Sequence, residues 1–241
     1  MTGSFANNAQ SHNGQLPDEQ FVRQLLRDSR QVKSVSGRMK LLSERLLGFP
    51  YNRKPLIGSP TQPEVLVTRM DSFDCLTFLE TVLALARIRN TEEFPAEIRN
   101  IRYSNGEVSY RSRLHYTTDW SRHQVEHGRL TEMTLGEETL SREKPLFFLK
   151  SLPPKLAHYR YFPKHRIDSV SRWLLDSDII YFVSGREGLD IGHLGLIVRD
   201  NQHLLMRHAA RSHRQVIEQE LGEFFRLNKM SGFIINRPRE I

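Results

Sequence analysis

The sequence predicts an α+β fold, in which helices precede a sheet of mostly antiparallel strands. Three observations predict it: helical patterns occupy the first third of the chain, one strongly apolar helical pattern follows near residue 80, and short apolar runs fill the C-terminal part. A doubly wound α/β sheet would need strands and helices to alternate along the chain instead. With 241 residues, the chain can bury one large core or two small ones.

Three helices are expected in the N-terminal half of the chain. A proline and two acidic residues begin an amphipathic pattern over residues 17–30. A second pattern covers 38–47 and ends at a glycine, and the proline-rich residues 49–63 are expected to form a loop. From 74 to 87, apolar side chains recur at helical spacing. This helix is the most apolar of the chain and is therefore expected to be central.

The C-terminal half is expected to consist mainly of strands. Residues 99–116 alternate in polarity around Asn105-Gly106, a pair typical of a tight hairpin turn. Residues 121–146 show no regular pattern, and a loop rich in Tyr and His follows the two prolines at 153 and 154. The remaining expected elements are a helix at 168–175, strands at 179–183, 194–198 and 204–207, a helix at 218–227 and a strand at 232–235.

An excess of basic residues gives the chain a formal net charge of +7 and a pI near 9.7. This charge would suit an anionic partner such as nucleic acid or a carboxylate-rich polymer. Lys and Arg are scattered, however, without a run of five or more, so the pattern favours a solvated surface over a nucleic-acid-binding patch. The sequence contains no stretch of 18 apolar residues, which argues against membrane insertion.

The first 15 residues are polar and lack the charged-then-apolar pattern of a signal peptide. Either the chain stays in the cytoplasm where it is made, or a signal was removed from a protein of the periplasm or cell envelope. We expect residues 1–15 to be a flexible N-terminus and 16–241 to form a single domain with insertions. The sequence does not indicate an oligomeric state.

The only cysteine, Cys75, excludes an intramolecular disulfide and a zinc site made of cysteines alone. A lone cysteine is either a small buried apolar residue or a nucleophile. Because Asp74 is a good N-cap residue, Cys75 is expected in the first turn of the apolar helix. There the helix dipole and the free N–H groups would stabilise a thiolate and a developing oxyanion.

Two of the ten histidines are candidates for the base that a thiol nucleophile needs. His193 follows a glycine at the start of an apolar strand, and His208 ends the next expected strand. If these strands pair as a hairpin around residues 199–202, the two imidazoles come close and one can orient the other. The alternative, that each is a structural histidine, stays open on spacing alone.

Four short motifs occur in a fixed chain order. They are Leu47-Gly48-Phe49-Pro50-Tyr51, Phe73-Asp74-Cys75-Leu76-Thr77-Phe78, Gly192-His193-Leu194-Gly195-Leu196 and His208-Ala209. Together they resemble the motifs of the NlpC superfamily of papain-like cysteine cell-wall hydrolases. Within it the chain is most similar to the N-acetylmuramoyl-L-alanine amidase-like family, through the segments 74–80, 113–116, 119–120 and 188–190. The resemblance covers about residues 17–239.

This resemblance implies a papain-like α+β fold, in which a helix that bears Cys75 packs on an antiparallel sheet that bears His193. It implies Cys75 as the nucleophile, His193 as the general base and His208 as the residue that orients this base. The Tyr51 hydroxyl would help to hold the oxyanion. In the implied reaction, Cys75 attacks the lactyl carbonyl of muramic acid, L-alanine leaves and water releases the acyl group. No metal or other cofactor is required.

A cluster of charged and aromatic residues follows the expected hairpin and would suit a sugar–peptide ligand. The family pattern favours ligand contact there over the alternative of core aromatic residues with exposed charges around them. Asp190 is either a turn carboxylate or a binding residue, and Asp74 belongs to a matching segment. The expected substrate-binding residues are Arg113, His115, Tyr116, Asp119, Trp120, Asp190 and Asp74.

Two positions depart from the family pattern. Ser177-Asp178 stands where the family commonly has a glycine before the aspartate, and this change should alter only a turn. At 146–149 this chain has Leu-Phe-Phe-Leu, where the family commonly has an element similar to Ser-Phe-Met. This change should reshape a wall of the substrate cleft. We therefore expect the second departure to affect fine specificity rather than the class of reaction.

The leading hypothesis is a cysteine amidase that hydrolyses the N-acetylmuramoyl-L-alanine bond of peptidoglycan or of muropeptides. One alternative is an endopeptidase that cuts the stem peptide after D-glutamate. Another is a non-catalytic peptidoglycan-binding module, for which the net charge and the aromatic cluster would suffice. The expected partner is peptidoglycan or its fragments, and the sequence does not indicate a preference between intact wall and soluble or anhydro-muropeptides.

Overall fold

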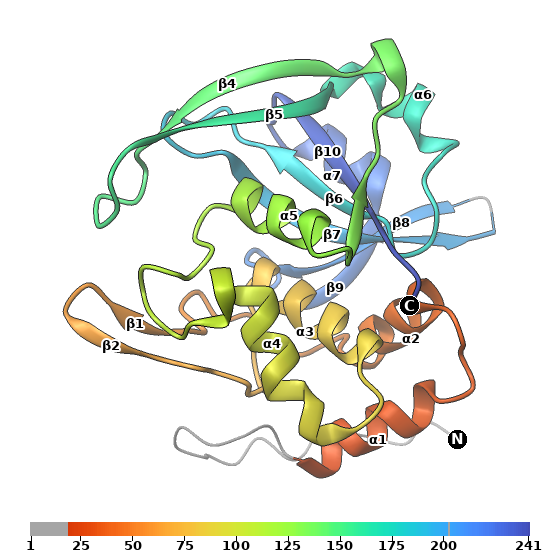
Figure 1. Ribbon diagram of the computed structural model, residues 1–241. Coiled ribbons are helices and arrows are strands. Elements are labelled where there is room, and N and C mark those ends of the chain that lie inside the picture. The colour runs from red at the N-terminus through yellow and green to blue at the C-terminus, as the bar shows by residue number, and fades with distance from the viewer. Residues whose placement is uncertain (1–18, 202) are drawn as a thin grey trace.

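The structure is a computed structural model that describes residues 19–201 and 203–241. The expected flexible N-terminus at 1–15 and the first two residues of the expected helix at 17–30 lie outside the described residues. Helices dominate the N-terminal part and an antiparallel sheet dominates the C-terminal part (Figure 1). The predicted order of helices followed by antiparallel strands is therefore confirmed.

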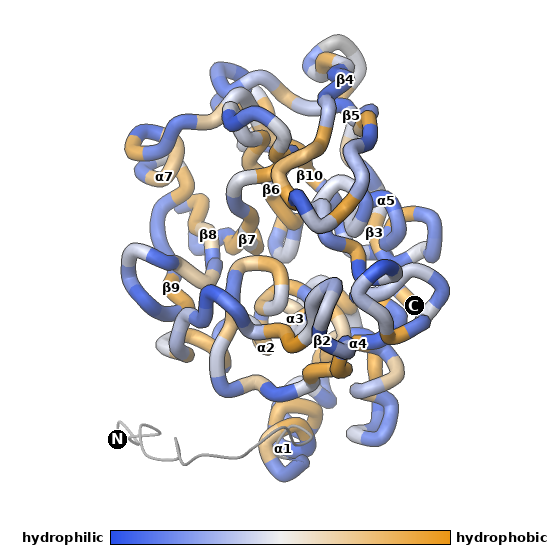
Figure 2. The backbone as a smooth tube through the Cα atoms, turned by 90° about the vertical axis from the view of Figure 1, so that its left-hand side faces the viewer, coloured by the Kyte–Doolittle hydropathy of each residue, from blue (hydrophilic) through white to orange (hydrophobic). Residues whose placement is uncertain are grey.

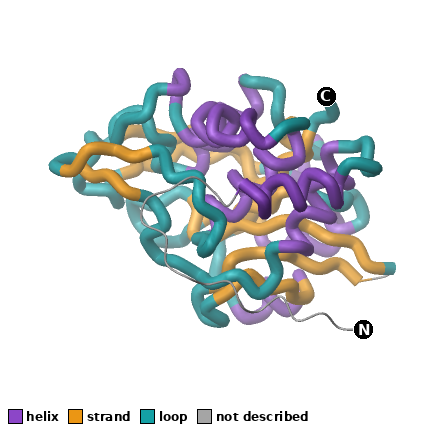
Figure 3. The backbone as a smooth tube through the Cα atoms, turned by 90° about the horizontal axis from the view of Figure 1, so that it is seen from below, coloured by secondary structure: helices purple, strands orange, loops and turns teal. Residues whose placement is uncertain are grey.

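The three expected N-terminal helices are present as α1 (Glu19–Ser29), α2 (Val35–Arg45) and α3 (Cys75–Arg87). Helix α3 is central, because every residue from Thr77 to Ala86 is buried. The other helices are α4 (Phe94–Arg102), α5 (Thr117–Glu126), α6 (Ile167–Ser171) and α7 (Leu221–Leu227), with short 3₁₀ turns at Thr91–Glu93, Ser104–Gly106, Gly136–Glu138 and Lys164–Arg166. Seen from below, helices lie over the strands (Figure 3). None of the helices in the described ranges is long and apolar enough to cross a membrane.

Eight strands form one antiparallel sheet in the order β4-β5-β10-β6-β7-β8-β9, with β3 also paired to β10. The strands are β3 (Leu130–Glu132), β4 (Leu140–Leu146), β5 (Lys155–Pro163), β6 (Ile179–Val183), β7 (Ile191–Asp200), β8 (His203–Ala210), β9 (Gln215–Glu220) and β10 (Gly232–Pro238). A separate small hairpin of β1 (Ile57–Ser59) and β2 (Gln62–Val65) begins within the loop expected at 49–63 and ends just beyond it.

The sheet separates two hydrophobic cores, because side chains alternate between its faces. Leu194 and Leu196 of β7 pack with the residues of α3 in the larger core. Ile197 of β7 and Met206 of β8 pack with α7 in the smaller core on the other face. Apolar residues concentrate along β6 and β10 at the centre of the sheet (Figure 2). The core that a histidine of β7 or β8 faces therefore depends on whether it occupies an odd or an even position along its strand.

The hairpin expected at 99–116 is wrong. Ile98 and Ile101 are both buried at helical spacing and belong to α4, which ends at Arg102. Asn105 and Gly106 do form a tight turn with positive φ, but this turn follows the helix. The segments on its two sides are linked by one isolated bridge and do not form two paired strands. The alternation was misleading because it crossed the end of a helix.

Other expected irregular regions contain strands. Residues 121–146 hold most of α5 together with β3 and β4, and the expected loop after residue 154 is β5. Strand β4 is largely exposed and lacks apolar alternation, whereas β5 does alternate, with Ala157 and Tyr161 buried on either side of the exposed Arg160 and His158, a period-two pattern that the expected loop overlooks. Part of the helix expected at 218–227 is β9, and the helix begins only at Leu221.

Candidate functional site

Cys75 is the first residue of α3, as the N-cap pattern predicts. The Asp74 carboxylate accepts a hydrogen bond from the backbone N–H of Thr77 at 2.8 Å, and the Thr77 hydroxyl accepts one from the N–H of Asp74 at 3.0 Å. This capping box fixes the start of the helix and therefore the position of the thiol. Asp74, expected to bind substrate, has its carboxylate engaged in the cap.

The thiol of Cys75 contacts the sheet where two strands separate. The pairing of β7 with β8 begins only at Leu196 and Arg207, so the first part of β7 pairs with β6 alone. In this opening the backbone N–H of Leu194 points to the sulfur. The start of α3 is thus in contact with the residue that follows His193.

Burial makes the resting thiol neutral. The surrounding protein desolvates Cys75 and, together with the charge of Asp74, raises the pKa of the thiol to about 12. The N–H groups of Leu194, Cys75 and Leu76 lower this pKa but do not outweigh burial. The expectation of a stabilised thiolate is therefore wrong for the resting protein, because desolvation is larger than the effect of the helix start.

The two candidate histidines lie together on the hairpin of β7 and β8. The Nε2 atom of His193 is 2.6 Å from the Nδ1 atom of His208, and the rings meet edge to face. Burial lowers the pKa of His193 to about 3 and that of His208 to about 4. Phe224 of α7 lies against both rings, at 5.5 and 5.7 Å between centroids. The predicted proximity of the imidazoles is confirmed, and both are neutral at pH 7.

The thiol and the imidazoles reach the site from different faces of the sheet. His193 is opposite Phe182 in the β6–β7 register, and Phe182 packs on α7. Cys75 belongs instead to α3, which covers the other face. In the described part of the chain the thiol has no hydrogen bond to either imidazole. Such contacts are often long in a protein without substrate, and the opening between β7 and β8 is where they would form.

Tyr51 completes the group that we call the Cys–His site, which consists of Tyr51, Cys75, His193 and His208. The N–H of Tyr51 donates to the carbonyl of Arg214 at 2.8 Å, and its backbone forms a bridge with Phe73, two residues before the cysteine. Desolvation, followed by the electrostatic effect of the neighbouring Cys75 and Asp74 groups, raises the pKa of the Tyr51 phenol, which is therefore a neutral hydrogen-bond donor at pH 7.

The charged residues among the expected substrate-binding group have partners within the protein. Arg113 pairs with Glu64 at 2.9 Å, and Asp119 forms an ion pair with Lys155. The Nε2 atom of His115 is 2.6 Å from the carbonyl oxygen of Tyr110. These groups connect the 113–120 segment to the β1–β2 hairpin, to the start of β5 and to the preceding turn.

The aromatic residues of the same segment are buried. Trp120 is 0% exposed and packs on Tyr181 of the central sheet, while Tyr116 is 2% exposed. Both are therefore core residues, as in the alternative interpretation of these two aromatic side chains. Asp190 is also buried, and its carboxylate accepts hydrogen bonds from the N–H and the hydroxyl of Thr118 at 2.7 and 2.8 Å. It thereby ties the start of α5 to the turn before β7.

The two departures from the family pattern have visible structural consequences. Ser177 has φ +69°, a conformation that favours glycine, so the change is confined to a turn. Phe147 and Phe148 both donate backbone hydrogen bonds to the carbonyl of Gly188, which precedes β7. A Cβ on Gly188 would lie 2.9 Å from the Phe147 ring, so only glycine allows this approach.

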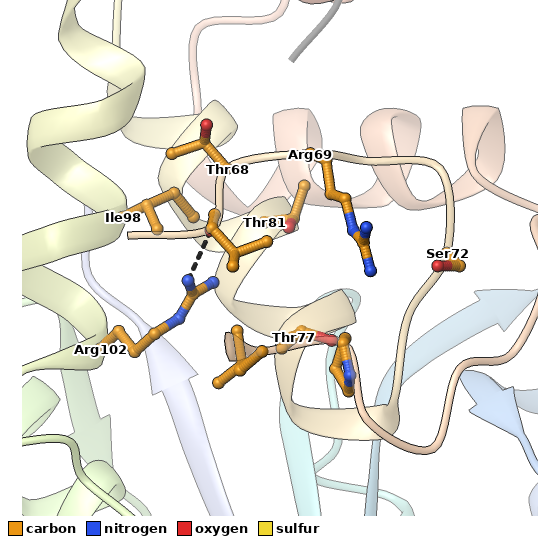
Figure 4. A pocket seen from close by; sticks show the side chains of 10 residues that line it. Thr68, Arg69, Ser72, Thr77, Thr81, Ile98 and Arg102 are labelled. Carbon is orange, nitrogen blue, oxygen red and sulfur yellow. Dashed lines mark hydrogen bonds between the residues drawn. The ribbon is translucent and has the colours of Figure 1, made fainter. Parts of the chain in front are cut away.

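A hollow beside α3 lies close to the Cys–His site without including any of its residues. Thr77, Arg69 and Arg102 are among the residues that line it (Figure 4). Arg102 donates to Glu80 at 2.8 Å, and Arg69 is 3.3 Å from Asp71. Both arginines thus have acidic partners. In residues 19–201 and 203–241 no group of three or more His, Cys, Asp and Glu side chains could hold a metal ion.

Sequence reasoning missed one polar residue of the site. The amide oxygen of Gln219, on β9, lies 2.9 Å from the Nε2 atom of His208. The helix expected at 218–227 includes Gln219, and only its place in β9 brings its side chain to the face of the sheet that bears His208. A search for alternation from Gln215 onward would have found the strand.

Comparisons with known proteins identify the family and the fold. Residues 41–233 match the model of the AmiA-like family, described as N-acetylmuramoyl-L-alanine amidase-like. The chain is similar to the crystal structure of an N-acetylmuramoyl-L-alanine amidase from Bacteroides uniformis, with 26% identity, a TM-score of 0.74 and coverage of 86% of this chain and 99% of that chain. A protein from Legionella pneumophila has the same fold, with 22% identity, a TM-score of 0.80 and coverage of 92% and 95%. No curated protein is significantly similar to the chain.

Proposed function

The chain belongs to the N-acetylmuramoyl-L-alanine amidase-like family, and we propose that it is a cysteine amidase that hydrolyses the bond between muramic acid and L-alanine. The observation that carries the proposal is the arrangement of Cys75 at a helix start beside the strand that bears His193. The contact between His193 and His208 supplies a base and a residue that orients it. The substrate would be peptidoglycan or a muropeptide.

The same proposal includes membership of the NlpC superfamily of papain-like hydrolases. In its support, the helix that starts at Cys75 packs on an antiparallel sheet, and the sheet carries the two histidines on adjacent strands. The order of Tyr51, Cys75 and the histidines along the chain agrees with the motifs of that superfamily.

The first half of the proposed reaction forms a thioester. His193 takes the proton of the thiol while the sulfur of Cys75 attacks the lactyl carbonyl of the muramoyl group. The Tyr51 hydroxyl and the backbone N–H groups at the start of α3 donate to the resulting oxyanion. When the intermediate collapses, the C–N bond breaks and the imidazolium of His193 gives its proton to the departing amine of L-alanine.

The second half releases the sugar. His193, neutral again, takes a proton from a water molecule that attacks the thioester carbonyl. The C–S bond then breaks, the proton returns to the sulfur of Cys75, and muramic acid leaves with a free lactyl carboxylate. The reaction then starts from a neutral thiol and a neutral imidazole, and the proton moves as the sulfur attacks once substrate has brought the two groups together.

A digest of purified muropeptides, separated and weighed by mass spectrometry, tests the proposal. An amidase releases the complete stem peptide and leaves the sugar without an amino acid. An endopeptidase that cuts after D-glutamate leaves the sugar attached to a dipeptide, and a non-catalytic binding module yields no product. The Cys75→Ala variant is the control. Absence of free stem peptide from the unaltered protein, or full activity of the variant, would contradict the proposal.

A thiol reagent offers a second control. Because Cys75 is the only cysteine, any loss of activity after treatment with iodoacetamide reports on this residue. The raised pKa of the thiol predicts slow labelling in the absence of substrate, so inactivation should be followed over hours and at alkaline pH as well as at pH 7.

A further inference from the structure

A chain of hydrogen bonds begins at Gln219 and ends at the proposed base. We propose that Gln219 is a positioning residue, which fixes the tautomers of His208 and His193 so that the Nδ1 atom of His193 is left free to accept a proton. The inference rests on the proposed function for its role in the reaction. The arrangement of protons that it assigns can be tested without any substrate.

The contacts that carry the inference lie on one face of three adjacent strands. The Gln219 amide oxygen on β9 is 2.9 Å from His208 Nε2 on β8, and His208 Nδ1 is 2.6 Å from His193 Nε2 on β7. In the β8–β9 register Gln219 is opposite Met206, one position along the same face from His208. The strand pairing therefore holds the amide and the two imidazoles in a row.

The direction of each hydrogen bond follows from the first acceptor. An amide oxygen can only accept, so Nε2 of His208 must carry a proton. Since His208 is neutral, its Nδ1 atom has a lone pair and accepts from Nε2 of His193. His193, also neutral, then has its lone pair on Nδ1. No hydrogen bond of the described chain uses this atom.

An amide suits this position better than a carboxylate would. A carboxylate beside His208 would favour the imidazolium, which has no lone pair and could not accept from His193. The titratable groups near His208 in the described residues are His193 on β7 and His213 in the turn after β8, and neither supplies a negative charge that would favour an imidazolium. Glu218, the next residue of β9, pairs with Arg207 on the other face of the sheet. Phe224 covers both rings from α7 and adds no polar group.

Nitrogen NMR of protein labelled with ¹⁵N-histidine tests the assignment directly. In a neutral imidazole the protonated and unprotonated nitrogens have well-separated shifts, so each tautomer is visible. We expect protonated Nε2 and unprotonated Nδ1 in both His193 and His208, at pH 7 and without substrate. The His193→Gln and His208→Gln variants assign the signals.

Substitutions of Gln219 supply the second readout. Gln219→Met keeps the size of the side chain and removes the acceptor, so His208 should populate both tautomers and kcat should fall by about 10-fold with little change in KM. Gln215→Met is the matched control, since Gln215 is an exposed glutamine on the same face of β9. It should change neither the spectrum nor kcat.

Gln219→Glu separates positioning from a structural role. The carboxylate preserves the acceptor but favours protonated His208, so the acidic limb of the kcat profile should move toward neutral pH. Circular dichroism and a urea titration check that each variant folds. A proton on Nδ1 of His208, or a Gln219→Met protein with unchanged tautomers and kcat, would overturn the inference. The expected tautomers in a protein that cleaves no muropeptide would instead contradict the proposed function alone.

Discussion

The Cys–His site and the 113–120 segment contain similar kinds of residues and use them differently. In the Cys–His site the thiol is contacted by backbone N–H groups, and Nδ1 of His193 has no hydrogen-bond partner among the described residues. In the 113–120 segment the charges of Arg113 and Asp119 are paired with Glu64 and Lys155. Polar groups that already have a partner within the protein must give up that partner before they can bind a ligand. The comparison is consistent with the proposed chemistry in the first region and with internal ion pairing in the second.

The largest expected effect is on the reaction, in the Cys–His site. Cys75→Ala removes the proposed nucleophile and should lower kcat for muropeptide hydrolysis by at least about 10⁴-fold. The unfolding free energy should change by less than about 1 kcal/mol, because one sulfur atom at the end of a helix is lost. Rate and urea unfolding measurements on the same preparation check both statements. A stable variant with more than one-hundredth of the original activity would show that Cys75 is not the nucleophile.

The next effect is on stability, in the 113–120 segment. Trp120→Ala should lower the free energy of unfolding by about 3–5 kcal/mol, because it empties a fully buried site next to Tyr181. The second tryptophan, Trp173, is 53% exposed and serves as control, and Trp173→Ala should cost less than about 1 kcal/mol. Urea titrations followed by circular dichroism compare the two. A Trp120→Ala protein with unchanged stability and a raised KM would show that Trp120 contacts the ligand.

A smaller effect is expected from the ion pair that anchors Arg113. Glu64→Gln leaves the Arg113 guanidinium in a site where its side chain is only 13% exposed, and should cost about 3 kcal/mol of stability. Glu107→Gln, at an exposed glutamate of the same region, should change stability by less than about 0.5 kcal/mol. The kcat of the folded Glu64→Gln protein should be unchanged. A lower kcat/KM with unaltered stability would show that this pair contacts the substrate.

The same comparison explains which predictions from the sequence succeeded. The hairpin that joins His193 and His208 was predicted because both strands are apolar and flank a short turn. The start of α3 was predicted because Asp74 is an N-cap residue that precedes a periodic apolar pattern. Both are local signals with a strong physical basis. These two local signals place most of the residues of the Cys–His site.

The remaining features depend on contacts between distant segments. Trp120 and Tyr116 are core residues because β6, β4 and α5 meet around them, which no local pattern shows. The neutral thiol of Cys75 likewise depends on how closely the sheet covers the helix start. The position of Gln219 follows from the β8–β9 register, and its own strand is mostly exposed. Alternation could have identified the strand of Gln219, but its register with β8 and the burial of the other residues are tertiary properties that the sequence alone could not supply.

The smallest expected effect concerns pH and distinguishes the buried imidazoles from exposed ones. The proposed base acts in its neutral form, and burial lowers the pKa of His193 to about 3 and that of His208 to about 4. Because the lowered pKa keeps both imidazoles neutral, kcat/KM should fall by less than about 2-fold between pH 7 and pH 5.5. An exposed histidine with a pKa near 6.5 would lose about 10-fold over this range. Initial rates on one muropeptide, with circular dichroism at each pH to verify folding, make the measurement. A 10-fold loss by a fully folded protein would mean that the base is exposed to solvent, and the distinction between the two regions would then rest on stability alone.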